Sequence, residues 1–371
     1  MDSNCQAFLN LVRAGLWESD VRLAPIKEIN FKNIYLLAQE QAVVGLVAAG
    51  LEHVVDVKPP KEIVLVFVGG ALQIEQRNQA MDFFVGELFK DLNDNDISGV
   101  LVKGQGVAQC YEKPSWRMSG DIDILFDNEN YFKARDYLFS LASSVDEEDK
   151  SRKHQAIMIG HWLVELHGTL HSRLLPSKMD DMSDEIQQYM FNYKRFRFWN
   201  LGEIEVTLPS ADNDVLFVFH HILQHFFGGG IGLRQICDWC RVLWTYRDEI
   251  NRELLKNRLL RAGMMTEWKA FAALAVNTLG MPVEAMPLYS SSRKWVRKSN
   301  RILALILESG NFGHNRDNSY RQKHSYVVYK AISLWRNTWD SMRHFMIFPM
   351  DATKVWWNRL WVGIKTVAQG K

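Results

Sequence analysis

Cysteine is scarce in this sequence. There are four in 371 residues, at Cys5, Cys110, Cys237 and Cys240. They are too few and too scattered for a disulfide framework, which indicates a reducing compartment. Cys237 and Cys240 have CxxC spacing, but the surrounding pattern is helical and lacks the βαβ context of a redox motif. We therefore interpret both as packing residues.

Long apolar runs are also missing. The densest run, residues 63–72, contains two glycines and falls well short of the ~20 residues needed to span a bilayer. The N-terminus has an acidic residue early and no basic stretch followed by an apolar one, so no signal peptide is expected. These absences predict a cytoplasmic protein without a transmembrane segment.

An excess of charge of either sign is missing too, because basic and acidic residues are nearly equal in number and the formal net charge is +1. Beyond residue 290, however, Lys and Arg outnumber Asp and Glu by roughly three to one. Such a region can meet nucleic acid, anionic lipid or an acidic partner. It is also typical of a helical subdomain with a solvated basic face and a tryptophan-filled core, which we favour. Six tryptophans lie there: Trp295, Trp335, Trp339, Trp356, Trp357 and Trp361.

The basic C-terminal segment 354–365 is amphipathic. Lys354, Arg359 and Lys365 alternate with Trp356, Trp357, Trp361 and Ile364. A helix of this kind can lie on a membrane surface. We favour docking on the chain's own helices or on a partner.

Hydrophobic periodicity predicts an α+β fold in three parts. Residues 1–96 show helical spacing that ends at a run of Asn and Asp. Residues 97–208 alternate between strand and helix and form a small mixed β-sheet core. Residues 209–371 predict a larger helical region, with helices at 210–227, 232–248, 251–263, 266–279, 290–308 and 320–345. The loop 309–320 is the most flexible by composition.

Within the predicted core, short apolar runs indicate strands. Residues 97–102 and 121–126 predict two of them, and 154–159 with 162–167 predict a hairpin around Gly160. Residues 106–111, 131–141 and 179–191 predict helices. Residues 196–199 and 204–207 predict two further β-like segments around Gly202.

Two carboxylates stand out on the second of these strands. Asp121 and Asp123 are two residues apart, so their side chains leave the strand on the same face. Two like charges so close together repel unless cations lie between them, and magnesium is the hard ion that suits carboxylate and phosphate oxygens. The alternative is a surface strand with both acids in water. Apolar neighbours and the space beside Gly120 favour a metal site.

A third acid lies in the hairpin. Glu165 is a lone glutamate in an apolar strand and needs a partner. A neighbouring strand would place it beside Asp121 and Asp123, where it could complete a metal site. The alternative is an edge residue in solvent or in an ion pair. His167 follows on the same face, either as a hydrogen-bond donor to the site or as an ordinary buried histidine.

These residues resemble the motifs of the nucleotidyltransferase superfamily, which is related to DNA polymerase beta. Within it, the chain is most similar to an uncharacterised bacterial nucleotidyltransferase-like family. The matching motifs are Lys103-Gly104 after the first strand, Arg117 before Gly120-Asp121-Ile122-Asp123, and Glu165-Leu166-His167. Residues 221–238 are similar to that family's helical segment. The resemblance covers roughly residues 97–245, and Lys103-Gly104 replaces the Gly-Ser usual in the superfamily.

The resemblance implies two-metal transfer of a nucleoside monophosphate from a nucleoside triphosphate, such as ATP, to a hydroxyl-bearing acceptor, with pyrophosphate release. Asp121, Asp123 and Glu165 would hold Mg²⁺ or Mn²⁺. Lys103 and Arg117 would offset phosphate charge. Backbone amides near Gly104 would cradle phosphate. A catalytically inactive relative that binds a nucleotide or a partner is the alternative.

Weaker signals lie in the helical part of the resemblance. His221 and His225 are four apart on a predicted helix, but the glutamate of a zincin motif is absent, so packed core or a lining of the cleft is a better interpretation than zinc. Arg234 and Asp238 are also four apart. They could pair on one helix face, and the resemblance suggests that they face the cleft. Nucleic acid is a candidate acceptor through the basic C-terminal region.

Overall fold

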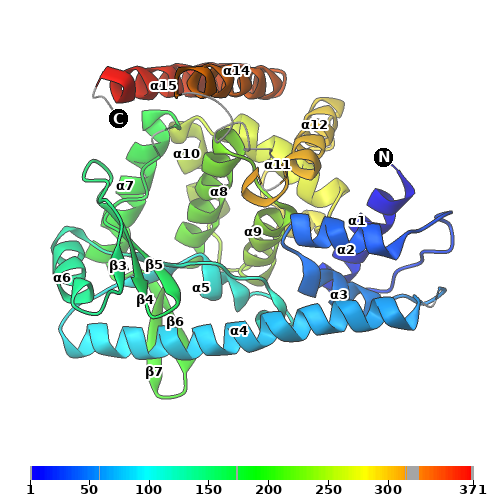
Figure 1. Ribbon diagram of the computed structural model, residues 1–371, viewed down its shortest axis with the longest axis horizontal. Coiled ribbons are helices and arrows are strands. Elements are labelled where there is room, and N and C mark those ends of the chain that lie inside the picture. The colour runs from blue at the N-terminus through cyan, green and yellow to red at the C-terminus, as the bar shows by residue number, and fades with distance from the viewer. Residues whose placement is uncertain (1, 58, 173, 314, 316–325, 369–371) are drawn as a thin grey trace.

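The computed structural model describes residues 2–57, 59–172, 174–313, 315 and 326–368. A small sheet lies against helices that come from both the N-terminal and the C-terminal parts of the chain (Figure 1). The predicted α+β architecture, a small mixed sheet flanked by helical regions, is therefore confirmed.

Four helices precede the sheet: α1 (Ser3–Trp17), α2 (Phe31–Glu40), α3 (Val44–Glu52) and α4 (Lys61–Asp94). Helices α1 and α3 touch backbone to backbone, because a Cβ on Gly15 would lie 2.0 Å from the carbonyl oxygen of Leu46. Only glycine permits that approach. Helix α4 is long enough to run past both the N-terminal helices and the sheet (Figure 1).

The sheet has five strands in the order β1-β2-β5-β4-β3. Their bounds are β1 Val100–Val102, β2 Ile122–Leu125, β3 Ser144–Val145, β4 His154–Ile159 and β5 Trp162–His167. Strands β2 and β5 are parallel, and the other neighbours are antiparallel. The predicted hairpin is confirmed at both ends of both strands. Strand β3 was not predicted, since two exposed residues carry no periodic pattern.

The two faces of the sheet have different neighbours. Ile122, Ile124 and Val164 pack into a core with residues of α4 such as Val85 and Phe89. The alternate residues face the other way, and Leu125, Val100 and Val102 join the core of the C-terminal helices. Asp123 and Glu165 are paired across β2 and β5 on this second face. The period of two therefore turns the carboxylates toward the C-terminal helices.

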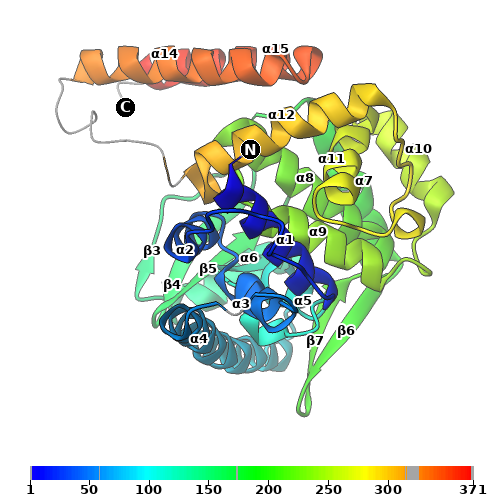
Figure 2. The same ribbon diagram turned by 90° about the vertical axis from the view of Figure 1, so that its right-hand side faces the viewer.

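Short elements connect and flank the strands. They are α5 (Gly104–Ala108), η1 (Pro114–Trp116), α6 (Asn128–Phe139) and α7 (Ser177–Asn192). Strands β6 (Phe196–Leu201) and β7 (Ile204–Pro209) form a separate hairpin that projects beyond the helices (Figure 2). The predicted segments around Gly202 are thus two strands of a second sheet.

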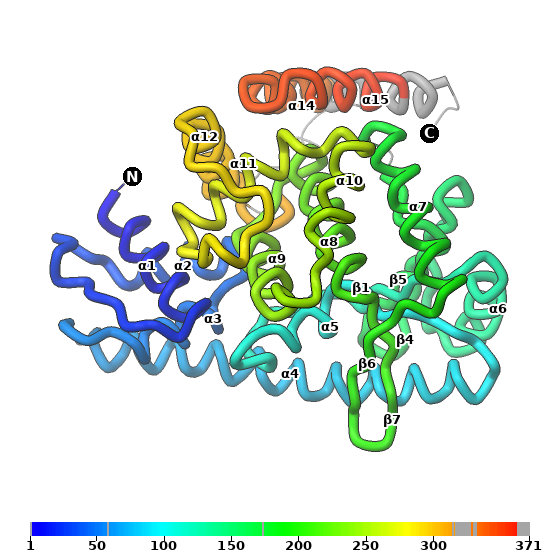
Figure 3. Tube along the Cα trace, turned by 180° about the vertical axis from the view of Figure 1, so that it is seen from behind, coloured from blue at the N-terminus to red at the C-terminus, as the bar shows by residue number. Residues whose placement is uncertain are grey.

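The C-terminal helices cover the acidic face of the large sheet (Figure 3). They are α8 (Ala211–Gly228), α9 (Leu233–Thr245), α10 (Arg252–Ala262), α11 (Met265–Asn277) and α12 (Arg293–Ser309), with short turns η2 (Val283–Ala285) and η3 (Asn311–Gly313). Five predicted helices are confirmed to within a few residues. Cys237 and Cys240 are buried and free on α9, as packing residues should be.

A helical hairpin of α14 (Tyr326–Phe345) and α15 (Pro349–Ala368) closes the chain (Figure 2). Phe348 is buried between α8 and α11, against Phe226 and Phe271. Arg359 donates to the carbonyl oxygen of Phe227 and Asn358 to that of Leu174. Part of the segment 354–365 therefore contacts the chain's own helices.

The prediction of a tryptophan-filled C-terminal core is wrong for four residues. Trp335, Trp339, Trp357 and Trp361 are exposed, because a two-helix hairpin packs on one side only. The side chains of Ile364 and Lys365 lie outside the described residues, as do residues 316–325, which include the second part of the predicted loop 309–320 and the start of the predicted helix 320–345. No helix among the described residues is long and apolar enough to cross a bilayer.

The proposed boundaries at 96/97 and 208/209 stay a prediction. One hydrophobic core contains residues of α1, α8, α11 and α15 together with Val100, Val102 and Leu125 of the sheet. The three predicted parts therefore share apolar packing, and the sheet is held between helices from both ends of the chain.

Candidate active site

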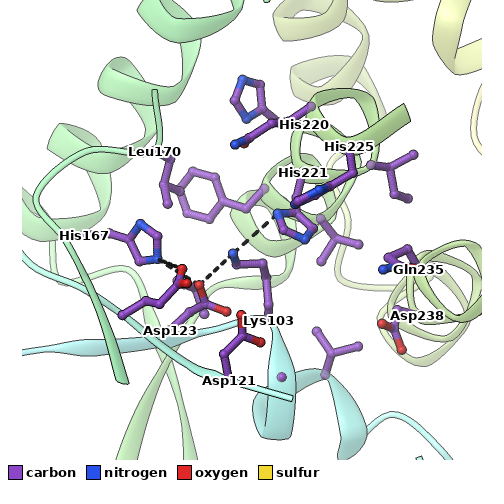
Figure 4. A pocket seen from close by; sticks show the side chains of 18 of the residues that line it. Lys103, Asp121, Asp123, His167, Leu170, His220, His221, His225, Gln235 and Asp238 are labelled. Atoms are coloured by element: carbon purple, nitrogen blue, oxygen red, sulfur yellow. Dashed lines mark hydrogen bonds and ion pairs between the residues drawn. The ribbon is translucent and has the colours of Figure 1, made fainter. Parts of the chain in front are cut away.

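A cavity of about 250 Å³ opens on the acidic face of the sheet, under α8 and α9 (Figure 4). Strands β2 and β5 supply its floor, and the start of α5 supplies one side. Every predicted site residue borders this cavity: Lys103, Gly104, Arg117, Gly120, Asp121, Asp123, Glu165, His167, His221, Arg234 and Asp238.

Three carboxylates meet on the floor of the cavity. Asp121, Asp123 and Glu165 each offer an oxygen, and these oxygens lie within 4.8 Å of one another. The charge of Asp123, reinforced by burial, raises the pKa of Asp121 to about 6. Such mutual repulsion is what a divalent cation relieves, and three hard oxygen donors fit Mg²⁺ or Mn²⁺. The acidic group could therefore hold a metal ion.

Lys103 lies inside this acidic group. Its Nζ is 2.8 Å from Oδ1 of Asp123 and 3.4 Å from Nδ1 of His221. Burial lowers the pKa of Lys103, but Asp123 and Asp121 outweigh burial and the net shift is upward. Burial likewise opposes ionisation of Asp123, yet Lys103 and His167 hold the pKa of Asp123 below its usual range. Lys103 is therefore a charged partner of the carboxylates. It lies at the turn into α5, with a backbone φ of 60°.

His167 is a hydrogen-bond partner of the site. Its Nε2 lies 2.8 Å from Oδ1 of Asp123, and the ring is buried at the end of β5. Glu165 is half-buried and paired with His154, 3.1 Å away on β4. Neither Glu165 nor His167 lies in bulk solvent: Glu165 is paired with His154, and His167 is a buried hydrogen-bond partner of Asp123.

The prediction that Arg117 grips phosphate does not fit its contacts. Its Nε and Nη2 donate to the two oxygens of Asp238, at 2.8 and 2.7 Å. Tyr111 donates to the same carboxylate and Ser119 accepts from Nη1 of Arg117. Burial opposes the charge of Arg117, but Asp238 outweighs it and raises the pKa of Arg117. The guanidinium borders the cavity, with Nε and Nη2 each bonded to Asp238 and Nη1 to Ser119.

The predicted pairing of Arg234 with Asp238 is wrong, because Arg117 occupies both oxygens of that carboxylate. Arg234 instead donates from Nη1 to the carbonyl oxygen of Met118, and its Nε is buried without a hydrogen-bond partner among the described residues. Burial, then the nearby Arg117, lowers the pKa of Arg234. A guanidinium with an unused donor beside the cavity suits an anion.

Histidines form the wall opposite the carboxylates (Figure 4). Burial, then the charge of Lys103, lowers the pKa of His221 well below its usual value and that of His225 to about 4. Both rings are therefore neutral near pH 7. His221 and His225 both line the cavity, and neither belongs to a metal-capable group among the described residues.

One arginine and three histidines among the lining residues were not predicted as site residues. They are Arg152, His154, His171 and His220. His154 had one signal, since it opens the strand that pairs with Glu165 and His167 in the predicted hairpin. Arg152 and His171 lie in connecting segments, and only the folded chain brings them to the cavity.

A small mixed sheet with three carboxylates converging beside a cationic pocket is the arrangement of a nucleotidyltransferase-type protein. The family model described as "Uncharacterised nucleotidyltransferase" matches residues 27–280, and the chain belongs to that family. No curated protein matches the chain. The family suggests nucleotidyl transfer as the activity, and a nucleotide as the substrate.

The raised pKa of Asp121 predicts how metal binding depends on pH. A cation must displace the proton from Asp121 below about pH 6, whereas above that pH the carboxylate is already ionised. We expect the affinity for Mn²⁺ to fall by about tenfold between pH 7 and pH 5. Calorimetric titration at several pH values measures it. Asp121→Asn should bind more weakly but with a flatter pH dependence, and a constant wild-type affinity across this range contradicts the expectation.

Proposed function

We propose that this protein transfers a nucleoside monophosphate from a nucleoside triphosphate to a hydroxyl group of an acceptor and releases pyrophosphate. The observation that carries the proposal is the convergence of Asp121, Asp123 and Glu165 within 4.8 Å of one another in a cavity that also contains cationic side chains. Membership of the family and the metal-capable acidic group support the same reaction.

Mg²⁺ or Mn²⁺ is the proposed cofactor, held by Asp121, Asp123 and Glu165. When bound, the ions would neutralise the attacking and leaving oxygens of an in-line displacement. The chain's own part is to hold the carboxylates in place. Lys103 and His167 both contact Oδ1 of Asp123, which leaves the carboxylate little freedom to turn.

The triphosphate is proposed to lie toward Lys103 and Arg234. Lys103 and Arg234 both border the cavity, and each positive charge would offset negative charge on phosphate oxygens. Arg117 would affect triphosphate binding indirectly, because its ion pair with Asp238 holds the segment that leads into Gly120 and Asp121. Gly104 borders the same space at a φ of 42°.

The acceptor side is proposed to lie near Glu165. Its carboxylate lies beside Asp123, and His154 holds it by a hydrogen bond. Glu165 would help to polarise the attacking hydroxyl. The neutral rings of His221 and His225 form the opposite wall, where they can donate or accept hydrogen bonds without adding charge.

Pyrophosphate release tests the proposal. The chain is incubated with each triphosphate, Mg²⁺ or Mn²⁺, and pools of metabolites, nucleic acids or proteins. Metal-dependent pyrophosphate release with a labelled acceptor supports transfer. The alternative is an inactive relative that binds a nucleotide or a partner. It is supported if triphosphate binds equally well without metal and in Asp121→Asn.

The acceptor could be a nucleic acid bound by the basic region beyond residue 290. Its binding would be dominated by phosphate contacts, so the affinity would fall steeply, by about 10³-fold, between roughly 50 and 200 mM salt. Fluorescence anisotropy with RNA and DNA oligonucleotides measures this. A flat salt dependence, or no binding, leaves a small molecule or a protein as the proposed acceptor.

Space beside Gly120 gives a prediction about nucleotide binding. A Cβ built on Gly120 meets no atom within 4 Å, and its φ is not positive, so a side chain fits without strain. Because Gly120 borders the cavity, we expect Gly120→Val to weaken triphosphate binding at least tenfold, about 1.4 kcal/mol, with little change in stability.

Fluorescent-nucleotide titration and thermal unfolding measure the two effects of Gly120→Val. The matched control is Gly229→Val, because Gly229 has equally open surroundings and does not border the cavity. Equal nucleotide affinity in Gly120→Val and wild type would place the nucleotide elsewhere.

A further inference from the structure

A second metal-capable group adjoins the three carboxylates and includes nitrogen donors. His154, Glu165 and His167 each offer a ligand atom within 4.8 Å of the others. The motif Glu165-Leu166-His167 lies in one strand, whereas His154 comes from the neighbouring strand. The group therefore depends on how β4 and β5 pair.

The strand pairing fixes this arrangement. His154 is the antiparallel partner of His167, and Ala156 is the partner of Glu165. Residues two apart on β5 share a face, so Glu165 and His167 point to the same side as Asp123 on β2. The rings of His154 and His167 lie with their centroids 4.8 Å apart at that face. All of these side chains border the same cavity.

The distances suit a single cation. Nε2 of His154 is 3.1 Å from Oε2 of Glu165, and Nε2 of His167 is 3.6 Å from the same oxygen. Metal bonds of about 2.0–2.2 Å place neighbouring donors roughly 3.0–3.5 Å apart around a tetrahedral or octahedral ion. Oδ1 of Asp123, 2.8 Å from Nε2 of His167, could supply a fourth donor.

We infer that His154, Glu165 and His167 form a site for a transition-metal ion such as Mn²⁺, Co²⁺ or Zn²⁺, next to the carboxylate site and joined to it through Glu165. Two imidazoles and a carboxylate suit these ions, whereas Mg²⁺ prefers oxygen ligands and retained water. The two positions would thus differ in the metal they select. The inference deepens the proposed function, on which it rests for the carboxylate site.

The competing explanation is that both histidines only orient the carboxylates by hydrogen bonds. The two explanations differ in metal selectivity. A histidine that acts through Glu165 or Asp123 would affect Mg²⁺ and Co²⁺ binding alike. A histidine that is itself a ligand would affect Co²⁺ binding much more than Mg²⁺ binding.

The experiment is a Co²⁺ titration of the metal-stripped full chain, read from its visible absorption, with Mn²⁺ electron paramagnetic resonance to detect nitrogen coupling. We expect an absorption band that excess Mg²⁺ does not remove. His154→Ala should weaken Co²⁺ binding at least about tenfold more than it weakens Mg²⁺ binding, because it removes a Co²⁺ ligand but only a hydrogen-bond partner of the Mg²⁺ ligand Glu165. Asp121→Asn should weaken Mg²⁺ binding and keep the Co²⁺ band.

Controls keep the inference open to refutation. His161→Ala changes an exposed histidine in the turn between β4 and β5 and should behave as wild type. His167→Gln is a second ligand variant, and thermal unfolding of each variant shows that it is folded. The inference is overturned if nitrogen coupling is absent, or if His154→Ala weakens Mg²⁺ and Co²⁺ equally. Because metal binding is measured without nucleotide, failure to transfer a nucleotide would count against the proposed function alone.

Discussion

Asp123→Asn is expected to lower metal-dependent pyrophosphate release by about 10³-fold, a loss of about 4 kcal/mol of transition-state stabilisation. The carboxylate of Asp123 is buried, lies within 4.8 Å of its two acidic neighbours and accepts from both Lys103 and His167. Asparagine keeps the size of the side chain but removes the charge that a cation needs. The measurement is a steady-state pyrophosphate assay with the acceptor pool that supports the wild-type reaction.

The matched control for this variant is Asp94→Asn, an exposed acid at the end of α4. It should retain wild-type activity. Thermal unfolding in the absence of metal shows whether Asp123→Asn is still folded, and so whether its loss of activity comes from the missing metal ligand or from unfolding. If Asp123→Asn is folded and still releases pyrophosphate at more than about a tenth of the wild-type rate, the proposed role of Asp123 is wrong.

Asp238→Ala is expected to destabilise the fold by about 3–5 kcal/mol, because it leaves the guanidinium of Arg117 buried without its charge partner. Both residues are almost fully buried, and the pair has two hydrogen bonds at 2.7 and 2.8 Å. Tyr111 would also lose its acceptor. Urea unfolding at pH 7 measures the change.

The control for Asp238→Ala is Asp248→Ala, whose carboxylate is exposed just beyond α9 and whose loss should cost less than about 0.5 kcal/mol. The double variant Arg117→Met/Asp238→Leu removes both charges and should recover most of the stability. It should weaken metal-dependent triphosphate binding without abolishing it, since Arg234 is proposed to contact phosphate and the Arg117–Asp238 pair only to hold the segment before Asp121. Loss of nucleotide binding in a stable double variant would return Arg117 to its predicted role.

Local periodicity was enough to predict the acidic floor of the cavity. Asp121 and Asp123 are two residues apart in a short apolar run, and the geometry of any strand turns them to one face. Glu165 and His167 follow the same rule in a hairpin whose ends were predicted correctly. That the two strands are neighbours came from the family resemblance, and the parallel register of Asp123 with Glu165 agrees with it.

The partners of Arg234 and Asp238 beside the cavity could not be predicted from local periodicity. Arg234 and Asp238 have the spacing of a helical ion pair, yet Asp238 pairs with Arg117, 121 residues away. An exposed pair of that kind stabilises by only a few tenths of a kcal/mol, whereas a buried carboxylate must find a bidentate partner. The packing of α9 against the loop before β2 therefore decides the pairing.

The sequence by itself determined the elements and the faces of the strands, because both follow from the local alternation of polar and apolar residues. It also placed three acids, Lys103 and Arg117 within residues 27–280, the part of the chain that the family model matches. Only the tertiary structure decided which charges neutralise one another and which donors stay unused, as Arg234 and His154 show. These contacts join residues from strands and helices far apart in the chain, and no local pattern encodes how such elements pack.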